Sequence, residues 1–148
     1  MARPHAVLLR EMRLALYSEL GARAIYADLA RLTRDAELRG VLEGLVLEQQ
    51  AQLERISSVM QALGARPPLR SLRRRLLAGL LALTAPLVGR RLVLRICAQA
   101  ADKAARWHAY FQLCLLHAGL DEHAAACAHL SETRRRHARV LDAWVWNL

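Results

Sequence analysis

The chain has 148 residues, of which 55% are hydrophobic, and it carries a formal net charge of +9. This length suits one domain with its own core, and a composition dominated by Leu and Ala favours helices over strands. The lack of any run of about 18 apolar residues argues against a membrane-spanning helix, and we expect no export signal. Cys97, Cys114 and Cys127 form no C-x-x-C pair, which predicts reduced, buried thiols in a cytoplasmic protein.

The first half of the chain predicts two long helices. The first covers residues 5–33 and the second covers residues 35–63. Acidic Asp35 and Glu37 favour the start of the second helix, because carboxylates stabilise a helix N-terminus. Gly64 favours its end, because glycine readily adopts the backbone conformation of a C-terminal cap.

The second predicted helix carries two amides in an otherwise apolar seam. Its seam residues follow one another at alternating steps of four and three, which keeps them on one helix face. They are Leu38, Leu42, Leu45, Gln49, Gln52, Ile56, Val59 and Leu63. The spacing therefore predicts that Gln49 and Gln52 point into the interior of a helical bundle.

An apolar segment with arginines at both ends separates the two halves of the chain. Residues 76–89 contain no charged side chain, and a helix of this length spans only about 21 Å of the roughly 30 Å hydrocarbon core. We also expect Pro86 to interrupt such a helix. The pattern favours a segment over 69–90 that lies in a bilayer interface, and the alternative is a buried crossover packed against the bundle. The expected membrane contacts are Arg73, Arg74, Arg75, Leu76, Leu80, Leu83, Leu87, Arg90 and Arg91.

The second half predicts helices over residues 90–118 and 121–146, separated at Gly119. The seam of the last helix repeats the steps of four and three. It consists of His123, Cys127, Leu130, Arg134, His137, Leu141, Trp144 and Leu148. Arg134 and His137 thus match the two glutamines as a polar pair in mid-seam. Two similar hairpins with polar residues at mid-height are the layout that a di-iron carboxylate bundle requires.

Several stretches of the chain resemble one enzyme family. The first-helix sequence ELGARAIYAD (19–28) is similar to a motif of the demethoxyubiquinone hydroxylases, and the similarity continues through ALTAPLVGRR (82–91) and CAQAADKAARWHAY (97–110). The resemblance implies one ferritin-like four-helix domain over 1–148, with an apolar crossover between its second and third long helices. It also implies a peripheral membrane protein that takes a long-tailed quinone from the bilayer and hydroxylates the ring with two irons.

The family's metal ligands are only partly present in this chain. Glu19 matches the first-helix Glu and His137 matches the fourth-helix His, so these two are the ligands that remain if a metal binds. Gln49 and Gln52 stand where the family has Glu and His, and Arg134 stands where it has Glu. Amides are poor iron ligands and a guanidinium repels a divalent cation, so the resemblance implies a degenerate site without a cofactor.

The third-helix ligand position falls near Asp102 or Lys103, and His108 loosely matches a histidine that the family often carries. Without metal, buried carboxylates need another cation. We therefore expect Glu19 to pair with Arg134 across the bundle centre, with Gln49, Gln52 and His137 completing a hydrogen-bonded network. The alternative is that the long Arg134 side chain bends out to solvent.

These observations predict a non-catalytic relative of the hydroxylases at the inner membrane, which binds the bilayer surface and a prenylated quinone, another lipid or a family partner. One alternative is an active di-iron quinone monooxygenase of ubiquinone biosynthesis with an unusual iron site. Another is a soluble helical scaffold whose apolar segment forms an oligomer interface, and we expect a homo-oligomer or a partner protein. Despite the arginine clusters, nucleic-acid binding is not expected, because no fold signal supports it.

Overall fold

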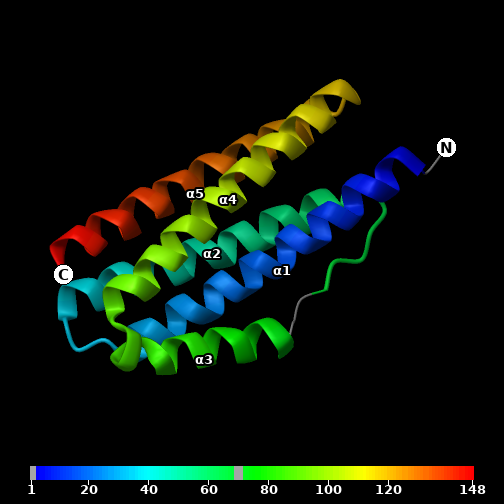
Figure 1. The fold of residues 1–148 in the computed structure, drawn as a ribbon. Helices are drawn as coiled ribbons and strands as arrows, with labels where there is room; N and C mark the ends of the chain where they lie inside the picture. The colour runs from blue at the N-terminus through cyan, green and yellow to red at the C-terminus, as the bar shows by residue number, and fades with distance from the viewer. Residues whose placement is uncertain (1–2, 69–71) are drawn as a thin grey trace.

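The computed structural model describes residues 3–68 and 72–148, and over these residues the protein is all-helical (Figure 1). The five helices of this part of the chain are α1 (Arg3–Leu32), α2 (Ala36–Ala62), α3 (Leu72–Val88), α4 (Arg90–His117) and α5 (Asp121–Asn147). The predicted all-α class is confirmed. The boundaries of the four long helices agree with the sequence predictions to within two residues.

Local sequence explains where the long helices begin and end. The Asp35 side chain caps α2 by accepting hydrogen bonds from the backbone N–H groups of Glu37 and Leu38, at 2.9 and 3.1 Å. At the other end of α2, Gly64 has a φ of +90°, and Gly119 after α4 has a φ of +77°. Residues with a Cβ rarely adopt a positive φ, so both positions favour glycine, which allows the chain to turn back sharply after each helix.

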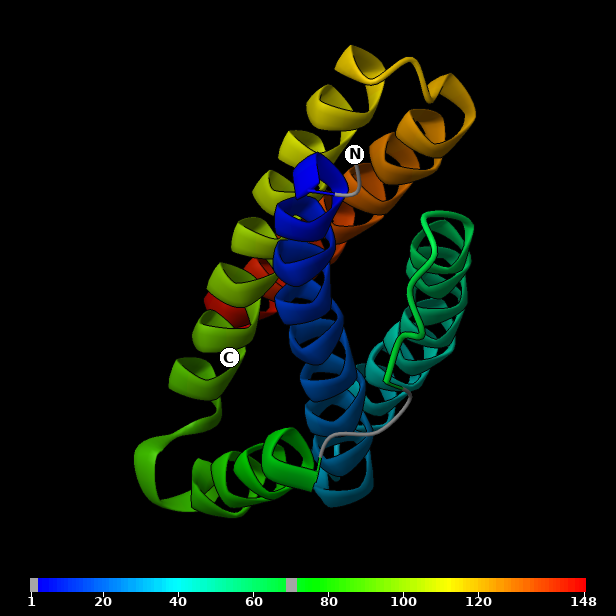
Figure 2. The ribbon, with the colours of Figure 1, turned by 90° about the vertical axis from the view of Figure 1, so that its right-hand side faces the viewer.

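The long helices form two hairpins that face each other. α1 packs along α2, and α4 packs along α5. The hairpins meet where α2 contacts α5 and where α1 contacts α4. α3 lies across the lower ends of α1 and α4 in the orientation of both ribbon views (Figures 1 and 2). The described residues thus form a bundle of four long helices with a fifth helix, α3, packed on one side.

α3 accounts for most of the predicted apolar segment 69–90, of which residues 69–71 lie outside the described part. The helix continues through Pro86 to Val88, so the expected interruption was wrong. Pro86 lies in the last turn, where its missing N–H removes only one hydrogen bond before the helix ends. The helix buries its small residues Ala78, Ala82 and Ala85 against the bundle. Among the described residues, no helix is both long and apolar enough to cross a membrane.

The bundle interior consists of two hydrophobic clusters. One lies at the end covered by α3 and contains Tyr26, Leu42 and Leu141. The other lies at the opposite end and contains Met12, Met60 and Phe111. Their positions along the helices leave a layer between them that is occupied by buried polar side chains. These are Glu19, Gln49, Gln52, His108, Ser131, Thr133, Arg134 and His137.

Candidate functional site

An ion pair stands at the centre of the polar layer. Glu19 of α1 and Arg134 of α5 are both fully buried, and the Arg134 Nε lies 3.3 Å from the Glu19 Oε1. The expected pairing of Glu19 with Arg134 is confirmed, and Arg134 does not bend out to solvent. Burying either charge alone is costly, so each side chain depends on the other to remain inside the bundle.

Two further helices supply hydrogen bonds to the Glu19 carboxylate. Gln49 of α2 donates from its Nε2 to the Glu19 Oε2 at 2.5 Å, and His108 of α4 lies with its Nε2 3.0 Å from the Oε1. Because a carboxylate only accepts, the His108 Nε2 carries the proton. Burial by itself raises the pKa of Glu19, but Arg134, His108 and Gln49 outweigh this effect and lower the pKa to about 2.

The Arg134 guanidinium also contacts three neutral acceptors. Its Nη1 lies 3.0 Å from the Tyr26 hydroxyl, 3.2 Å from the Gln49 Oε1 and 3.3 Å from the His137 Nδ1. Burial lowers the pKa of His137, and the adjacent Arg134 cation lowers it further. A neutral His137 accepts from Arg134 at Nδ1 and therefore donates from Nε2.

The acceptor for the His137 Nε2 proton is the side chain of Glu48, which is partly exposed at the edge of the polar layer. The His137 Nε2 is 2.5 Å from the Glu48 Oε2, and Arg136 donates to the same oxygen at 2.9 Å. Burial raises the pKa of Glu48, whereas the hydrogen bonds from Arg136 and His137 lower it below its ordinary value. A continuous chain of contacts therefore runs from buried Glu19 through Arg134 and His137 to the half-buried Glu48 carboxylate.

Two expected members of the site lie elsewhere. Gln52 is buried, but its Nε2 donates to the Leu130 carbonyl at 3.1 Å and so links α2 to the backbone of α5. Asp102 is exposed and forms an ion pair with Arg106 at 3.2 Å. The face of α4 that meets the other helices runs through Ala101, Ala104, Ala105 and His108, and a helical step of 100° turns Asp102 away from it.

Sequence reasoning gave Tyr26, His108 and Glu48 no firm place in the site. Tyr26 follows Glu19 by two helical turns, so the seven-residue spacing was the available signal. His108 follows Ala101 and Ala104 on the alanine-rich face of α4, which predicts its burial. Glu48 precedes the buried Gln49, and only the tertiary packing of α5 against α2 brings it to His137.

The three cysteines are all free thiols. Cys97 and Cys127 are buried as expected, whereas Cys114 is partly exposed, which corrects the prediction for that residue. Burial raises the pKa of Cys97 and of Cys127 to about 12. Both are therefore protonated at neutral pH and unsuited to nucleophilic chemistry.

The side chains of the polar layer do not fit the two irons of the resembled family. The Arg134 guanidinium lies between Glu19 and His137, which are the two residues that match the family's ligands. A fixed cation at this place repels a divalent metal, and Gln49 already uses both ends of its amide within the network. Among residues 3–68 and 72–148, no three His, Cys, Asp or Glu side chains are grouped as metal ligands.

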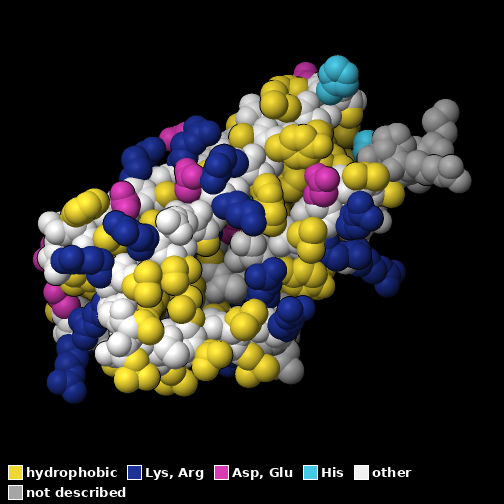
Figure 3. Space-filling model, viewed as in Figure 1, with side chains coloured by type: hydrophobic (Ala, Val, Ile, Leu, Met, Phe, Trp, Pro, Cys, Tyr) yellow, Lys and Arg dark blue, Asp and Glu magenta, His cyan; other side chains and the backbone are white. Residues whose placement is uncertain are grey.

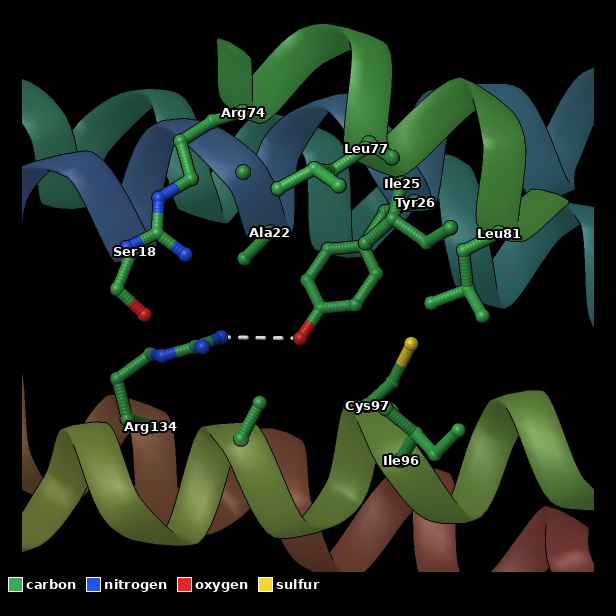
Figure 4. Close-up of a pocket in the computed structure, with 13 residues that line it drawn as sticks. Ser18, Ala22, Ile25, Tyr26, Arg74, Leu77, Leu81, Ile96, Cys97 and Arg134 are labelled. Atoms are coloured by element: carbon green, nitrogen blue, oxygen red, sulfur yellow. Dashed lines mark hydrogen bonds between the residues drawn. The ribbon is translucent and has the colours of Figure 1, made fainter. Parts of the chain in front are cut away.

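A pocket of about 190 Å³ connects this layer to α3 (Figure 4). It lies between α1, α3 and α4. Leu77 and Leu81 of α3 and Ile96 of α4 line it, and Arg134 and Arg74 stand at one end beside Ser18. The Tyr26 ring extends across the pocket so that its hydroxyl meets Arg134. The ion pair is thus in contact with an apolar space directly beneath α3.

The outer face of α3 is apolar and bordered by arginines. Hydrophobic side chains line the lower rim of the molecule in Figure 3, where α3 lies, and Lys and Arg side chains stand at both ends of that rim. Leu80, Leu83 and Leu87 are 61%, 66% and 87% exposed. The other exposed members of this leucine face are Leu76, Leu77 and Val88, and the exposed flanking arginines are Arg73, Arg74, Arg75, Arg90 and Arg91.

Comparison of the chain with family models, with curated proteins and with solved structures gave no match. Three features of the molecule bear on its function: the buried ion pair, the apolar pocket next to it and the exposed leucine face of α3.

Proposed function

We propose that this protein is a peripheral membrane protein that docks on an anionic bilayer through α3 and receives a lipid in the pocket beneath that helix. The observation that carries the proposal is the orientation of α3. Its alanines face the bundle, and Leu77 and Leu81 line the pocket. The larger side chains Leu76, Leu80, Leu83 and Leu87 face outward, the reverse of what burial of the largest apolar side chains would produce. A contiguous exposed apolar patch of this kind marks an interaction surface.

The arginines favour a bilayer as the partner of this surface. Arg73 and Arg75 lie at the start of α3, and Arg90 and Arg91 follow its end, so cations border the leucines on both sides. A short apolar helix with basic residues at its ends can lie at the headgroup boundary, where leucines enter the acyl region and arginines reach lipid phosphates. The 17 residues of α3 suit this orientation.

The finer fold and the family belong to the same proposal. The two facing hairpins, the crossover helix and the sequence similarity favour a ferritin-like domain that diverged from the demethoxyubiquinone hydroxylases. Arg134 in place of a metal ligand favours a non-catalytic role, in which the bundle binds a prenylated quinone or another lipid. An active hydroxylase would instead contain iron, so iron analysis of protein expressed with ample iron distinguishes the two, and we expect much less than one iron per chain.

Sedimentation with lipid vesicles tests the docking surface. We expect the wild type to sediment with anionic vesicles at low salt, to bind neutral phosphatidylcholine vesicles less, and to be released as salt screens the arginines. The double substitution Leu80→Glu and Leu83→Glu should abolish binding, because it places carboxylates in the acyl region.

Leu47 of α2 and Leu113 of α4 provide a matched control, since they are 74% and 65% exposed but lie outside α3. Leu47→Glu with Leu113→Glu changes net charge equally and should leave vesicle binding intact. Wild-type protein that remains in the supernatant at low salt, or equal binding by the two double variants, would rule out docking through α3. If α3 is instead the interface of a soluble oligomer, the Leu80→Glu and Leu83→Glu variant should dissociate into smaller species in the absence of lipid.

A further inference from the structure

The pocket beneath α3 is polar at one end and apolar elsewhere. Figure 4 shows Arg134 at that end with the Tyr26 hydroxyl beside it, and Leu77, Leu81 and Ile96 further along. The 13 residues that line the pocket include no Asp or Glu. Apolar walls with a few convergent polar groups are typical of a site for a small ligand.

The Arg134 guanidinium has hydrogen-bonding capacity left over at this pocket. Its hydrogen bonds within the protein all come from Nη1, which faces Tyr26, Gln49 and His137. The Nη2 is buried and has no hydrogen-bond partner among the described residues, and the Nε faces Glu19 as an ion pair without hydrogen-bond alignment. A buried guanidinium nitrogen without an acceptor is costly, so an acceptor supplied by a ligand would remove this penalty.

The groups at the polar end of the pocket can both donate. The Nη2 of Arg134 has no acceptor function, and the Tyr26 hydroxyl, which accepts from Nη1, still has its own proton to donate. A carbonyl oxygen has two lone pairs and no proton, so one carbonyl group can accept from both donors at once. The donors therefore favour a ligand whose head group is a carbonyl.

The charges around the pocket favour a ligand that is neutral. Glu19 lies 3.3 Å from Arg134 and already neutralises it. Arg74, on the pocket wall, already has an interaction within the protein, so no counter-charge is inferred for it. An anionic ligand would bring a second negative charge close to Glu19, and an uncompensated charge in a protein interior is costly.

The size of the pocket restricts the rest of the ligand. An apolar cavity of about 150 Å³ holds one benzene molecule, and the pocket, at about 190 Å³, is only slightly larger. It therefore accepts a carbonyl group with the first carbons of one chain, but not a ring that carries several substituents. The remaining chain would leave past Leu77 and Ile96, whose side chains are 49% and 39% exposed.

We infer that the pocket binds the carbonyl end of a neutral single-chain lipid, such as a long-chain ketone or ester, whose oxygen accepts from the Arg134 Nη2 and the Tyr26 hydroxyl. The inference rests on the proposed function for the origin of this ligand, which is the bilayer on which α3 docks. It goes further by naming the ligand's head group as an uncharged carbonyl on a linear chain.

A pair of ligands that differ in one atom group tests the hydrogen bond to Arg134. The probes are methyl heptyl ketone and the alkene in which a methylene group replaces the carbonyl oxygen. Both are volatile, so gas chromatography of the vapour above the full chain, without vesicles, measures the free ligand and hence each affinity. The ratio of the two affinities is then compared between the wild type and Arg134→Lys, which cancels the different hydration of the two ligands.

Arg134→Lys keeps a cation opposite Glu19 but removes the Nη2. We expect the preference for the ketone over the alkene to be at least about tenfold greater in the wild type than in Arg134→Lys, because a hydrogen bond from a charged donor is lost. Arg135→Lys is the control, since the Arg135 side chain is 51% exposed and lies outside the pocket, and it should leave the preference unchanged. Circular dichroism checks that both variants fold.

A spectroscopic measurement on the wild type tests the same bond without any substitution, and it decides the matter if Arg134→Lys does not fold. The ketone is labelled with carbon-13 at its carbonyl, whose resonance moves downfield when the oxygen accepts hydrogen bonds. We expect the bound ketone to resonate at least as far downfield as the ketone in water. A resonance like that of the ketone in an alkane would mean that the oxygen has no donor and would overturn the inference.

Two further probes test the charge and the shape of the head group. Octanoate has the same heptyl chain, with a negatively charged oxygen in place of the methyl group of the ketone, and should bind more weakly beside Glu19. A benzoquinone with a heptyl chain and three further ring substituents should also bind more weakly, because its ring exceeds the pocket.

Tighter binding of octanoate or of the quinone, or an equal preference for the ketone in the wild type and Arg134→Lys, would overturn the site for a neutral linear carbonyl. If those results came with retained vesicle binding, the proposed docking function would stand alone. Selective ketone binding without any vesicle binding would instead support the pocket and contradict the docking of α3.

Discussion

At the Arg134 guanidinium, acceptors from three helices converge within the bundle. Glu19 and Tyr26 come from α1, Gln49 comes from α2 and His137 comes from α5. The contacts explain why a chain with glutamines in an apolar seam can still fold. Gln49 donates to the anion with one end of its amide and accepts from the cation with the other, so both halves of the amide have partners in the interior.

Removing the cation from this arrangement should be strongly destabilising. We expect Arg134→Met to lower the free energy of unfolding by about 3–5 kcal/mol, because it leaves the Glu19 carboxylate buried without its counter-charge. Adding Glu19→Gln to that variant should restore part of the loss. Arg135→Met is the control, since Arg135 is exposed next in sequence, and its effect should stay within about 0.5 kcal/mol. Urea unfolding measures all four proteins, and equal effects of the Arg134 and Arg135 substitutions would contradict the pairing.

The same carboxylate should make stability depend on acidic pH. The pKa of Glu19 is about 2 in the folded protein against an ordinary value of 4.5, so the unfolded chain takes up a proton first as the pH falls. The stabilisation is fully present above about pH 4.5 and is lost progressively toward pH 2, amounting to a few kcal/mol. Unfolding measured across this range should show a steeper loss in the wild type than in Glu19→Gln. Parallel curves would mean that Glu19 titrates normally.

The sequence could predict which side chains of α2 and α5 point into the polar layer, but not all of the contacts that they make there. The steps of four and three placed Gln49, Arg134 and His137 in the interior, because a helix face follows directly from spacing. The resemblance placed the third-helix ligand position near Asp102 or Lys103, and Asp102 lies on the exposed face of α4. The alanines that define the buried face carry no chemical signal. The contact between His137 and Glu48 depends on how α5 packs against α2, which spacing within one helix does not determine.

At the scale of the element, α3 reverses the ordinary use of apolar side chains. Its location could be predicted from the uncharged stretch between arginines, but its length could not, because the helix continues through Pro86. Its orientation could not, because an apolar helix without a polar stripe carries no pattern that distinguishes an inward face from an outward one. The small residues Ala78, Ala82 and Ala85 mark the buried face at steps of four and three, and they allow α3 to approach the bundle closely.

Substitutions on the two faces of α3 should therefore have opposite consequences. Ala82 is buried, so Ala82→Leu should overpack the contact with the bundle and cost about 1–3 kcal/mol of unfolding free energy. Leu83 is exposed, so Leu83→Ala should change stability by less than about 0.5 kcal/mol but weaken vesicle binding. Thermal unfolding and vesicle sedimentation of both variants test the assignment. Destabilisation by Leu83→Ala comparable to that by Ala82→Leu would show that the faces are reversed.

For the whole molecule, the polar layer separates two hydrophobic clusters, and α3 covers only one of them. The cluster beneath α3 includes Tyr26 and Cys97, which also line the pocket. The ion pair, the pocket and the leucine face of α3 therefore follow one another from the centre of the bundle to its surface. In the proposed function this is the path that connects a lipid in the bilayer to the buried charges.

The depth of α3 in a bilayer is the most direct test of this account. Leu83→Trp on α3 and Leu113→Trp on α4 place an indole at positions of nearly equal exposure, 66% and 65%. With anionic vesicles that contain lipids brominated along the acyl chain, each variant is compared with the wild type, whose tryptophans provide the background. We expect the added fluorescence of Leu83→Trp to shift to the blue and to be quenched, and that of Leu113→Trp to remain unchanged. Equal quenching of both, or of neither, would contradict the docking of this protein through α3.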